Sequence, residues 1–225
     1  MRPLVAQGLA GYGGWRALVN CAAAALLALG LAAAAEARPV RVLAFGDSLT
    51  SGYGLPPEET FPARLEARLR ADGVAAQIIN AGVSGDTTAG ALARLDWSLG
   101  DKPDYVLVEL GANDALRGLD PQQAYANLDR ILARLKAAQV KVMLLGMQAP
   151  ANWGRDYDRS FDAIYPKLAA KWQVPLYPFF LDGVALDPKL TQGDGLHPNA
   201  KGVDIIVERL APAVERWLAQ GEGRG

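Results

Sequence analysis

Residues 38–220 alternate between short apolar runs and longer stretches in which apolar residues have helical spacing. Five apolar runs predict buried strands, at 40–45, 75–79, 105–110, 140–145 and 175–180. Helical spacing predicts helices over 58–70, 88–99, 124–138, 158–172 and 198–218. Strands that alternate with helices are typical of a parallel sheet covered on both faces. The pattern therefore predicts an α/β fold, a three-layer α/β/α sandwich with a mostly parallel five-stranded sheet.

Residues 1–37 follow a different pattern. Arg2 and Arg16 precede an apolar run over 17–35, and the segment closes with the small-residue pattern Ala35-Glu36-Ala37. A positive start, an apolar middle and small residues at the end are typical of a secretory signal peptide. The sequence therefore predicts cleavage near Ala37 and a periplasmic or secreted protein.

Two other interpretations of this segment stay open. An apolar run of this length can also span a bilayer as an uncleaved anchor. Cys21 suggests a lipoprotein, although it precedes the apolar run instead of following it. After cleavage we expect one domain over 38–220, a flexible glycine-rich tail over 221–225 and no stable membrane span.

Composition narrows the function classes. The 225 residues are 51% hydrophobic and 21% charged, which is typical of a packed globular protein. Lys and Arg number 23 against 24 Asp and Glu, so the chain has no overall basic charge for holding nucleic acid. One Cys and one His exclude a disulfide framework and a zinc site built from those two residue types.

Polar residues gather in the loops that follow the predicted strands. In a parallel sheet covered by helices, sites form beyond the carboxyl ends of the strands. Four segments fall in such loops: Gly46-Asp47-Ser48-Leu49, Asn80–Asp86, Gly111-Ala112-Asn113-Asp114 and Asp194-Gly195-Leu196-His197-Pro198. We expect them to meet at one edge of the sheet.

These loops contain the groups that nucleophilic catalysis by serine requires. A serine hydroxyl needs a base to take its proton, and the base works best when a third group orients it. Ser48 is the candidate nucleophile, and His197, the single histidine, is the candidate base. Asp194 lies three residues before His197, close enough to orient its ring. The developing oxyanion needs hydrogen-bond donors, which Gly85, Asn113 and the backbone of Ser48 offer.

Each of these residues also has a plain structural interpretation. Asp47 and Ser48 suit an Asx-turn and a helix N-cap, Asn113-Asp114 suits a turn, and a single His is often a cap or a surface residue. Their coincidence in four strand-end loops favours a site. Phosphate-loop, dinucleotide-binding, zinc-protease and G-x-S-x-G motifs do not occur in the sequence.

The four segments, in this order and spacing, resemble the blocks of the GDSL or SGNH hydrolase family, whose fold is flavodoxin-like. Within the family, the chain most resembles the periplasmic acyl-CoA thioesterase, lysophospholipase and arylesterase group. The resemblance also rests on the stretches 106–111, 149–157, 163–169 and 174–180. It departs from the usual Gly-Gly-Asn-Asp block at Ala112, which puts selectivity in doubt more than activity.

The resemblance implies Ser48 as nucleophile, His197 as base and acid, and Asp194 as its orienter. It implies an oxyanion hole of the Ser48 N–H, Gly85 and Asn113, and no metal or organic cofactor. The expected substrate is a small-molecule acyl ester or thioester, including lysophospholipids, and the expected state is a monomer or weak oligomer.

The segment 147–157 follows the fourth predicted strand and suits a pocket wall. Met147 and Trp153 are its candidate substrate-binding residues, and packing in the core is the alternative for both. Two other functions stay open: a carbohydrate O-acetylesterase, and a non-catalytic envelope protein that binds lipid in the same cleft.

Overall fold

The computed structural model describes residues 38–222, and the predicted signal segment 1–37 lies outside them. The strands are β1 (Val40–Gly46), β2 (Ala76–Gly82), β3 (Tyr105–Glu109), β4 (Lys141–Leu145) and β5 (Leu176–Tyr177). The helices are α2 (Ser48–Ser51), α3 (Phe61–Ala71), α4 (Thr88–Ser98), α5 (Ala112–Leu116), α6 (Pro121–Ala137), α7 (Arg155–Asp162), α8 (Ile164–Trp172) and α9 (Ala200–Glu222). Two short 3-10 turns are η1 (Pro57–Glu59) and η2 (Leu99–Asp101).

The five strands form one parallel sheet in the order β2-β1-β3-β4-β5. This order confirms the predicted parallel five-stranded sheet. The central strands β1 and β3 are buried along nearly their whole length, as their uninterrupted apolar sequence requires.

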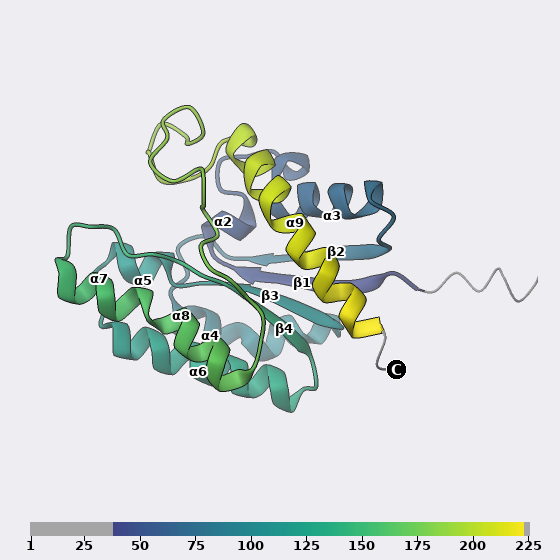
Figure 1. Cartoon of the computed structure of the whole chain (residues 1–225), viewed down its shortest axis with the longest axis horizontal. Helices are drawn as coiled ribbons and strands as arrows, with labels where there is room; N and C mark the ends of the chain where they lie inside the picture. Colours follow the sequence, from purple (N-terminus) through teal and green to yellow (C-terminus); the bar gives the residue numbers. More distant parts are fainter. Residues whose placement is uncertain (1–37, 223–225) are drawn as a thin grey trace, which may run out of the picture. The chain divides into compact units, whose positions relative to one another are not determined.

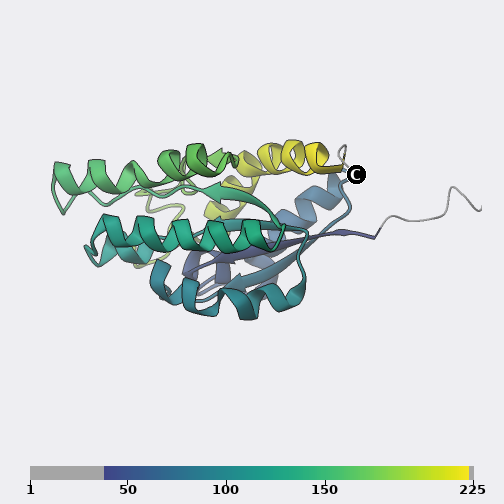
Figure 2. The same cartoon turned by 90° about the horizontal axis from the view of Figure 1, so that it is seen from below.

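Helices cover both faces of the sheet and complete the three layers (Figures 1 and 2). On one face, α3 packs against α9, and on the other α4 packs against α6, which packs in turn against α8. The apolar stripe of α6 is fully buried and includes Leu128, Ile131 and Leu135. Burial of such stripes against the sheet is the main force that holds the layers together.

The structure differs from the sequence prediction in several elements. The short helices α2 and α5 form within two of the segments expected to be loops. The helix predicted over 158–172 is two helices that meet at Ala163, because Pro166 has no N–H to donate to the carbonyl of Asp162. The strand predicted over 175–180 has only the two residues of β5, which prolines bracket on both sides. The last helix continues to Glu222 and so takes in two residues assigned to the tail.

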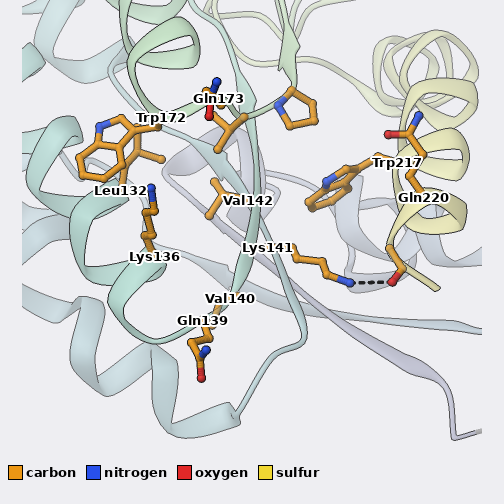
Figure 3. A pocket seen from close by; sticks show the side chains of 13 residues that line it. Leu132, Lys136, Gln139, Val140, Lys141, Val142, Trp172, Gln173, Trp217 and Gln220 are labelled. Atoms are coloured by element: carbon orange, nitrogen blue, oxygen red, sulfur yellow. Dashed lines mark hydrogen bonds between the residues drawn. The ribbon is translucent and has the colours of Figure 1, made fainter. Parts of the chain in front are cut away.

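A cavity of about 580 Å³ opens at the amino-terminal edge of the sheet, where β4 begins and helices end. Trp172 and Trp217 line two of its sides, and Val142 lies between them (Figure 3). The predicted site residues follow the other ends of the strands, so this cavity contains none of them.

Candidate active site

The strand register brings the predicted loops together at the carboxyl edge of the sheet. Gly46, the last residue of β1, lies beside Gly82 of β2 on one side and beside Glu109 of β3 on the other. The loops that follow these three strands therefore start side by side. A Cβ atom at Gly46 or Gly82 would lie within 2.7 Å of neighbouring backbone, so only glycine allows this close approach.

Ser48, His197 and Asp194 form a connected line of hydrogen bonds. His197 Nε2 lies 2.9 Å from Ser48 Oγ, and His197 Nδ1 lies 2.6 Å from Asp194 Oδ2. Ser48 is the first residue of α2, and 149 positions separate it from His197. The arrangement has the geometry of a nucleophile, a base and an orienting carboxylate.

Asp194 is held in its orienting position by its own loop. Its Oδ1 atom accepts hydrogen bonds from the backbone N–H groups of Leu196 and His197, at 2.9 and 3.0 Å. The hydrogen bond with His197, with support from these two, lowers the pKa of Asp194 to about 2. The group therefore stays ionised over the whole range in which an imidazole changes charge.

Hydrogen bonds join the loop that carries His197 to the loop that follows α2. Gln192 Nε2 donates to the carbonyls of Tyr53 and Pro198, at 2.7 and 3.0 Å, and Gln192 N donates to the carbonyl of His197. The Tyr53 ring lies against the imidazole, with the ring centroids 4.6 Å apart. These contacts fix the imidazole beside Ser48.

Asp47 joins the segment of the candidate nucleophile, Ser48, to the third predicted segment. Its Oδ1 atom accepts from the backbone N–H of Leu49 at 3.0 Å, so Asp47 is the N-cap of α2. Its Oδ2 atom accepts from the side-chain amide of Asn113, also at 3.0 Å. An amide nitrogen carries two hydrogens, and this bond occupies one of them. The bond therefore fixes the direction of the other.

The candidate oxyanion donors come from three segments: the first turn of α2, the turn after β2 and the short helix α5. Ser48 is the first residue of a helix, so its N–H has no partner within that helix. Gly85 has a φ of +84° and is exposed in the turn after β2, and within residues 38–222 its N–H donates to no protein acceptor. Together with the free amide hydrogen of Asn113, these are donors of the kind that stabilise an oxyanion.

A second carboxyl group is buried behind Asp47. Glu109, at the end of β3, is 1% exposed, and its Oε2 atom accepts from Thr50 Oγ1 at 2.7 Å. Burial, with the nearby charge of Asp47, raises the pKa of Glu109 well above its usual range. Burial also raises the pKa of Asp47, to about 6.

The two candidate substrate residues lie in different surroundings. Met147 belongs to the hydrophobic core and is 3% exposed, which favours packing over contact with a substrate. Trp153 is 46% exposed, and its indole N–H donates to the carbonyl of Ala115 at 2.8 Å. Its ring covers Gly118, just beyond α5, so Trp153 borders the end of the helix that carries Asn113.

Within 38–222, no group of three or more His, Cys, Asp or Glu side chains lies in an arrangement that could hold a metal ion.

Sequence reasoning missed several residues that shape the site. Glu109 had a visible signal, because it is an acid inside an otherwise apolar strand run. The link from Asp47 to Asn113 had none, since both residues also suit turns. Gln192 and Arg117, which contact other loops, likewise carried no local signal.

Comparisons with known proteins show which family the chain resembles. Residues 44–205 match the model of the GDSL-like Lipase/Acylhydrolase family. "Thioesterase 1/protease 1/lysophospholipase L1" of Escherichia coli K12 is 42% identical over 175 residues, which are 77% of this chain and 83% of that protein. An "Arylesterase" of Vibrio mimicus is 40% identical over 84% of this chain and 94% of its own. The crystal structure of AlinE4, described as an SGNH-hydrolase family esterase, superposes with a TM-score of 0.69 at 49% identity, covering 82% of this chain and 99% of that one.

Proposed function

The chain belongs to the GDSL-like lipase/acylhydrolase family and is an ester hydrolase, and we propose that it acts through an acyl-serine intermediate formed on Ser48. The single observation that carries this proposal is the line of hydrogen bonds from Ser48 Oγ through His197 to Asp194. A pure binding protein has no need of an oriented imidazole beside a serine hydroxyl.

In the first half of the reaction, Ser48 Oγ attacks the acyl carbon while His197 Nε2 takes its proton. The negative charge that develops on the acyl oxygen is held by the N–H groups of Ser48 and Gly85 and by the amide of Asn113. Asp194, ionised and bonded to Nδ1, stabilises the imidazolium that forms. His197 then gives its proton to the leaving alcohol or thiol, and the acyl group stays on Ser48.

In the second half, a water molecule replaces the leaving group. His197 Nε2 takes a proton from this water as its oxygen attacks the acyl carbon, and the same donors hold the oxyanion. Collapse of this intermediate breaks the bond to Ser48 Oγ, which receives the proton from His197, and releases the carboxylic acid.

We propose small acyl esters and thioesters, including aryl esters and lysophospholipids, as the substrate class. The names of the relatives support this range. Exposed apolar side chains on the loops around the site also support it, because they suit an acyl or aryl group: Tyr53, Val83, Leu116, Leu119, Trp153 and Leu196.

We also propose that the protein is exported and cleaved near Ala37. The charge and apolar pattern of the first 37 residues supports this. In the described part of the chain, no helix has both the length and the apolar character needed to cross a bilayer. Mass spectrometry of the protein recovered from a periplasmic fraction tests the proposal, and a chain that begins at Arg38 is the expected result.

Ser48→Ala tests the proposed mechanism. The variant is expected to lose turnover of p-nitrophenyl esters from acetate to palmitate while it keeps the wild-type melting temperature, since it loses a single hydroxyl. Ser160→Ala is the matched control, because Ser160 is exposed on α7. Turnover in Ser48→Ala equal to that of the control would refute the acyl-serine proposal. Activity confined to acetate would replace lipid acyl groups with acetyl esters as the substrate class.

Asn113→Ala tests the oxyanion hole separately. Loss of one oxyanion donor is expected to lower kcat by about 10²–10³ with little change in KM. An unchanged kcat would remove Asn113 from the oxyanion hole and leave the role of Ser48 intact.

A further inference from the structure

Gly85 occupies an open position for a residue that must aim a backbone N–H accurately. It is exposed, its φ is +84°, and a Cβ atom placed on it would have one neighbour within 4 Å. That neighbour is Nη2 of Arg117, at 3.8 Å. Side-chain packing around Gly85 is therefore sparse, and the orientation of its peptide groups depends on hydrogen bonds, such as the one from the Asp86 N–H to the Val83 carbonyl that closes the turn.

Contacts on either side of Gly85 tie its loop to two other elements. The Ser84 hydroxyl lies 2.8 Å from the hydroxyl of Ser51 in α2. Asp86 forms an ion pair with Arg94 of α4, at 2.6 Å. Neither contact leads to α5, the helix that carries Asn113.

Arg117 supplies the missing connection. It is the C-cap residue of α5, four positions after Asn113, and its backbone N–H donates to the Asn113 carbonyl. Its side chain reaches across to the turn after β2, where Nη2 donates to the carbonyl of Gly85 at 2.9 Å. One residue therefore contacts the backbone of both separate arms of the oxyanion hole.

The segment around Arg117 is itself held by hydrogen bonds from α7 and from the loop that precedes it. Tyr157 Oη donates to the carbonyl of Leu119 at 2.9 Å, and the Trp153 indole donates to the carbonyl of Ala115 at 2.8 Å. The carbonyls that accept these bonds lie on either side of Arg117 in the sequence, so the backbone from which the Arg117 side chain extends is held in place.

We propose that Arg117 is a positioning residue that sets the distance between the Gly85 and Asn113 arms of the oxyanion hole. The proposal rests on the oxyanion roles given under the proposed function. The guanidinium holds the Gly85 carbonyl and restricts rotation of the adjoining backbone, so the Gly85 N–H converges on the point that the Asn113 amide faces. The planar guanidinium suits this task, because it keeps several donors in a fixed geometry.

Kinetics of Arg117 variants test the proposal with the full chain. Arg117→Ala is expected to lower kcat on a p-nitrophenyl ester about 10-fold or more with KM nearly unchanged, because a donor that is misplaced by a fraction of an ångström loses transition-state stabilisation. The melting temperature is expected to stay at the wild-type value, since an exposed hydrogen bond adds little stability. Arg130→Ala, an exposed position on α6, is the matched control.

Rescue experiments separate positioning from a general structural effect. Guanidinium ion added at non-denaturing concentration is expected to restore part of the kcat of Arg117→Ala, and Arg117→Lys is expected to retain more activity than Arg117→Ala. The affinity of an alkyl boronic acid, which forms a tetrahedral adduct with an active serine, is expected to fall by the same factor as kcat/KM. Asn113→Ala treated with guanidinium ion is expected to show no recovery.

The outcomes distinguish this inference from the proposed function. A wild-type kcat in Arg117→Ala together with a lowered kcat in Asn113→Ala would overturn the role of Arg117 alone. A wild-type kcat in both variants would overturn the oxyanion hole on which that role depends. A lowered kcat in Arg117→Ala with no rescue and an unchanged boronic acid affinity would also overturn the positioning role of Arg117.

Discussion

The two carboxylate oxygens of Asp47 have different partners, and both partners lie in the proposed site. Oδ1 accepts from the Leu49 N–H at the start of α2, the helix that carries the proposed nucleophile, while Oδ2 accepts from the Asn113 amide. The carboxylate is fully buried, which raises its pKa to about 6. An ionised Asp47 is therefore unfavourable for stability but suits the hydrogen bonds that aim Asn113.

Asp47→Asn is expected to be less active and, at neutral pH, relatively more stable. Asparagine has one acceptor oxygen, so it can cap α2 but cannot also accept from Asn113 without a clash of amide groups. The kcat is expected to fall about 10-fold or more, because the Asn113 amide is no longer oriented toward the oxyanion. Steady-state kinetics on a p-nitrophenyl ester check this, and a wild-type kcat would show that Asn113 is aimed by other contacts.

The stability difference between these two proteins is expected to depend on pH. The pKa of Asp47 is raised from 3.8 in the unfolded chain to about 6 in the folded one, so its favourable contribution is present below pH 3.8 and is lost as pH rises through about 6. As pH rises from 3.8 to above about 6, the free energy of unfolding of Asp47→Asn should therefore increase relative to that of the wild type. Urea unfolding at pH 4 and pH 7 measures the change. A constant difference would contradict the desolvation of Asp47.

Among elements, Arg94 of α4 ties the ends of two strands together. Its guanidinium donates to the carbonyl of Gly46 at the end of β1 and to the carbonyl of Ala81 near the end of β2, at 2.8 and 2.9 Å. It also pairs with Asp86 and lies over the Phe45 ring, 4.4 Å from its centroid. The turn that leads to Ser48 therefore depends on a side chain from a neighbouring helix.

Arg94→Met is expected to destabilise the protein by about 3 kcal/mol, because it leaves the mostly buried Asp86 carboxylate without its ion-pair partner and removes one hydrogen bond from each of the Gly46 and Ala81 carbonyls. Arg134→Met is the matched control, since Arg134 forms a more exposed pair with Asp96 that should contribute less than about 1 kcal/mol. Urea unfolding of both variants gives the comparison. Equal destabilisation by the two substitutions would show that the contacts of Arg94 do not stabilise the turn that leads to Ser48.

The sequence predicted elements whose stability comes from local pattern and burial, and it missed features set by contacts between distant residues. Runs such as 105–110 and 140–145 predicted strands to within a residue, because a buried parallel strand is apolar throughout. The break at Ala163 was predictable from Pro166 inside an expected helix. The bonds from Asp47 to Asn113 and from Arg117 to Gly85 were not, because each joins loops that follow different strands.

On the scale of the whole molecule, residues 38–222 contain both the hydrophobic core that the structure describes and the proposed site. In the sequence, the residues of the buried apolar cluster extend from Val42 to Leu218. Ser48, Asp194 and His197, which form the line of hydrogen bonds, lie within the same stretch of sequence. The single cysteine of the chain, Cys21, precedes the described residues. Folding and catalysis of residues 38–225 therefore need no thiol.

Two truncations are expected to have opposite results. A chain of Arg38–Gly225 should unfold in one transition and keep the kcat/KM of the full chain, with or without dithiothreitol. A chain that ends at Leu210 should fail to fold, because it lacks Val214, Trp217 and Leu218, which are buried in the core. Removing these three side chains from the core forfeits more than about 5 kcal/mol, a large part of the stability of a domain this size. Circular dichroism melting and ester turnover of both chains measure this. Loss of activity in Arg38–Gly225 would show that the first 37 residues take part in the folded enzyme.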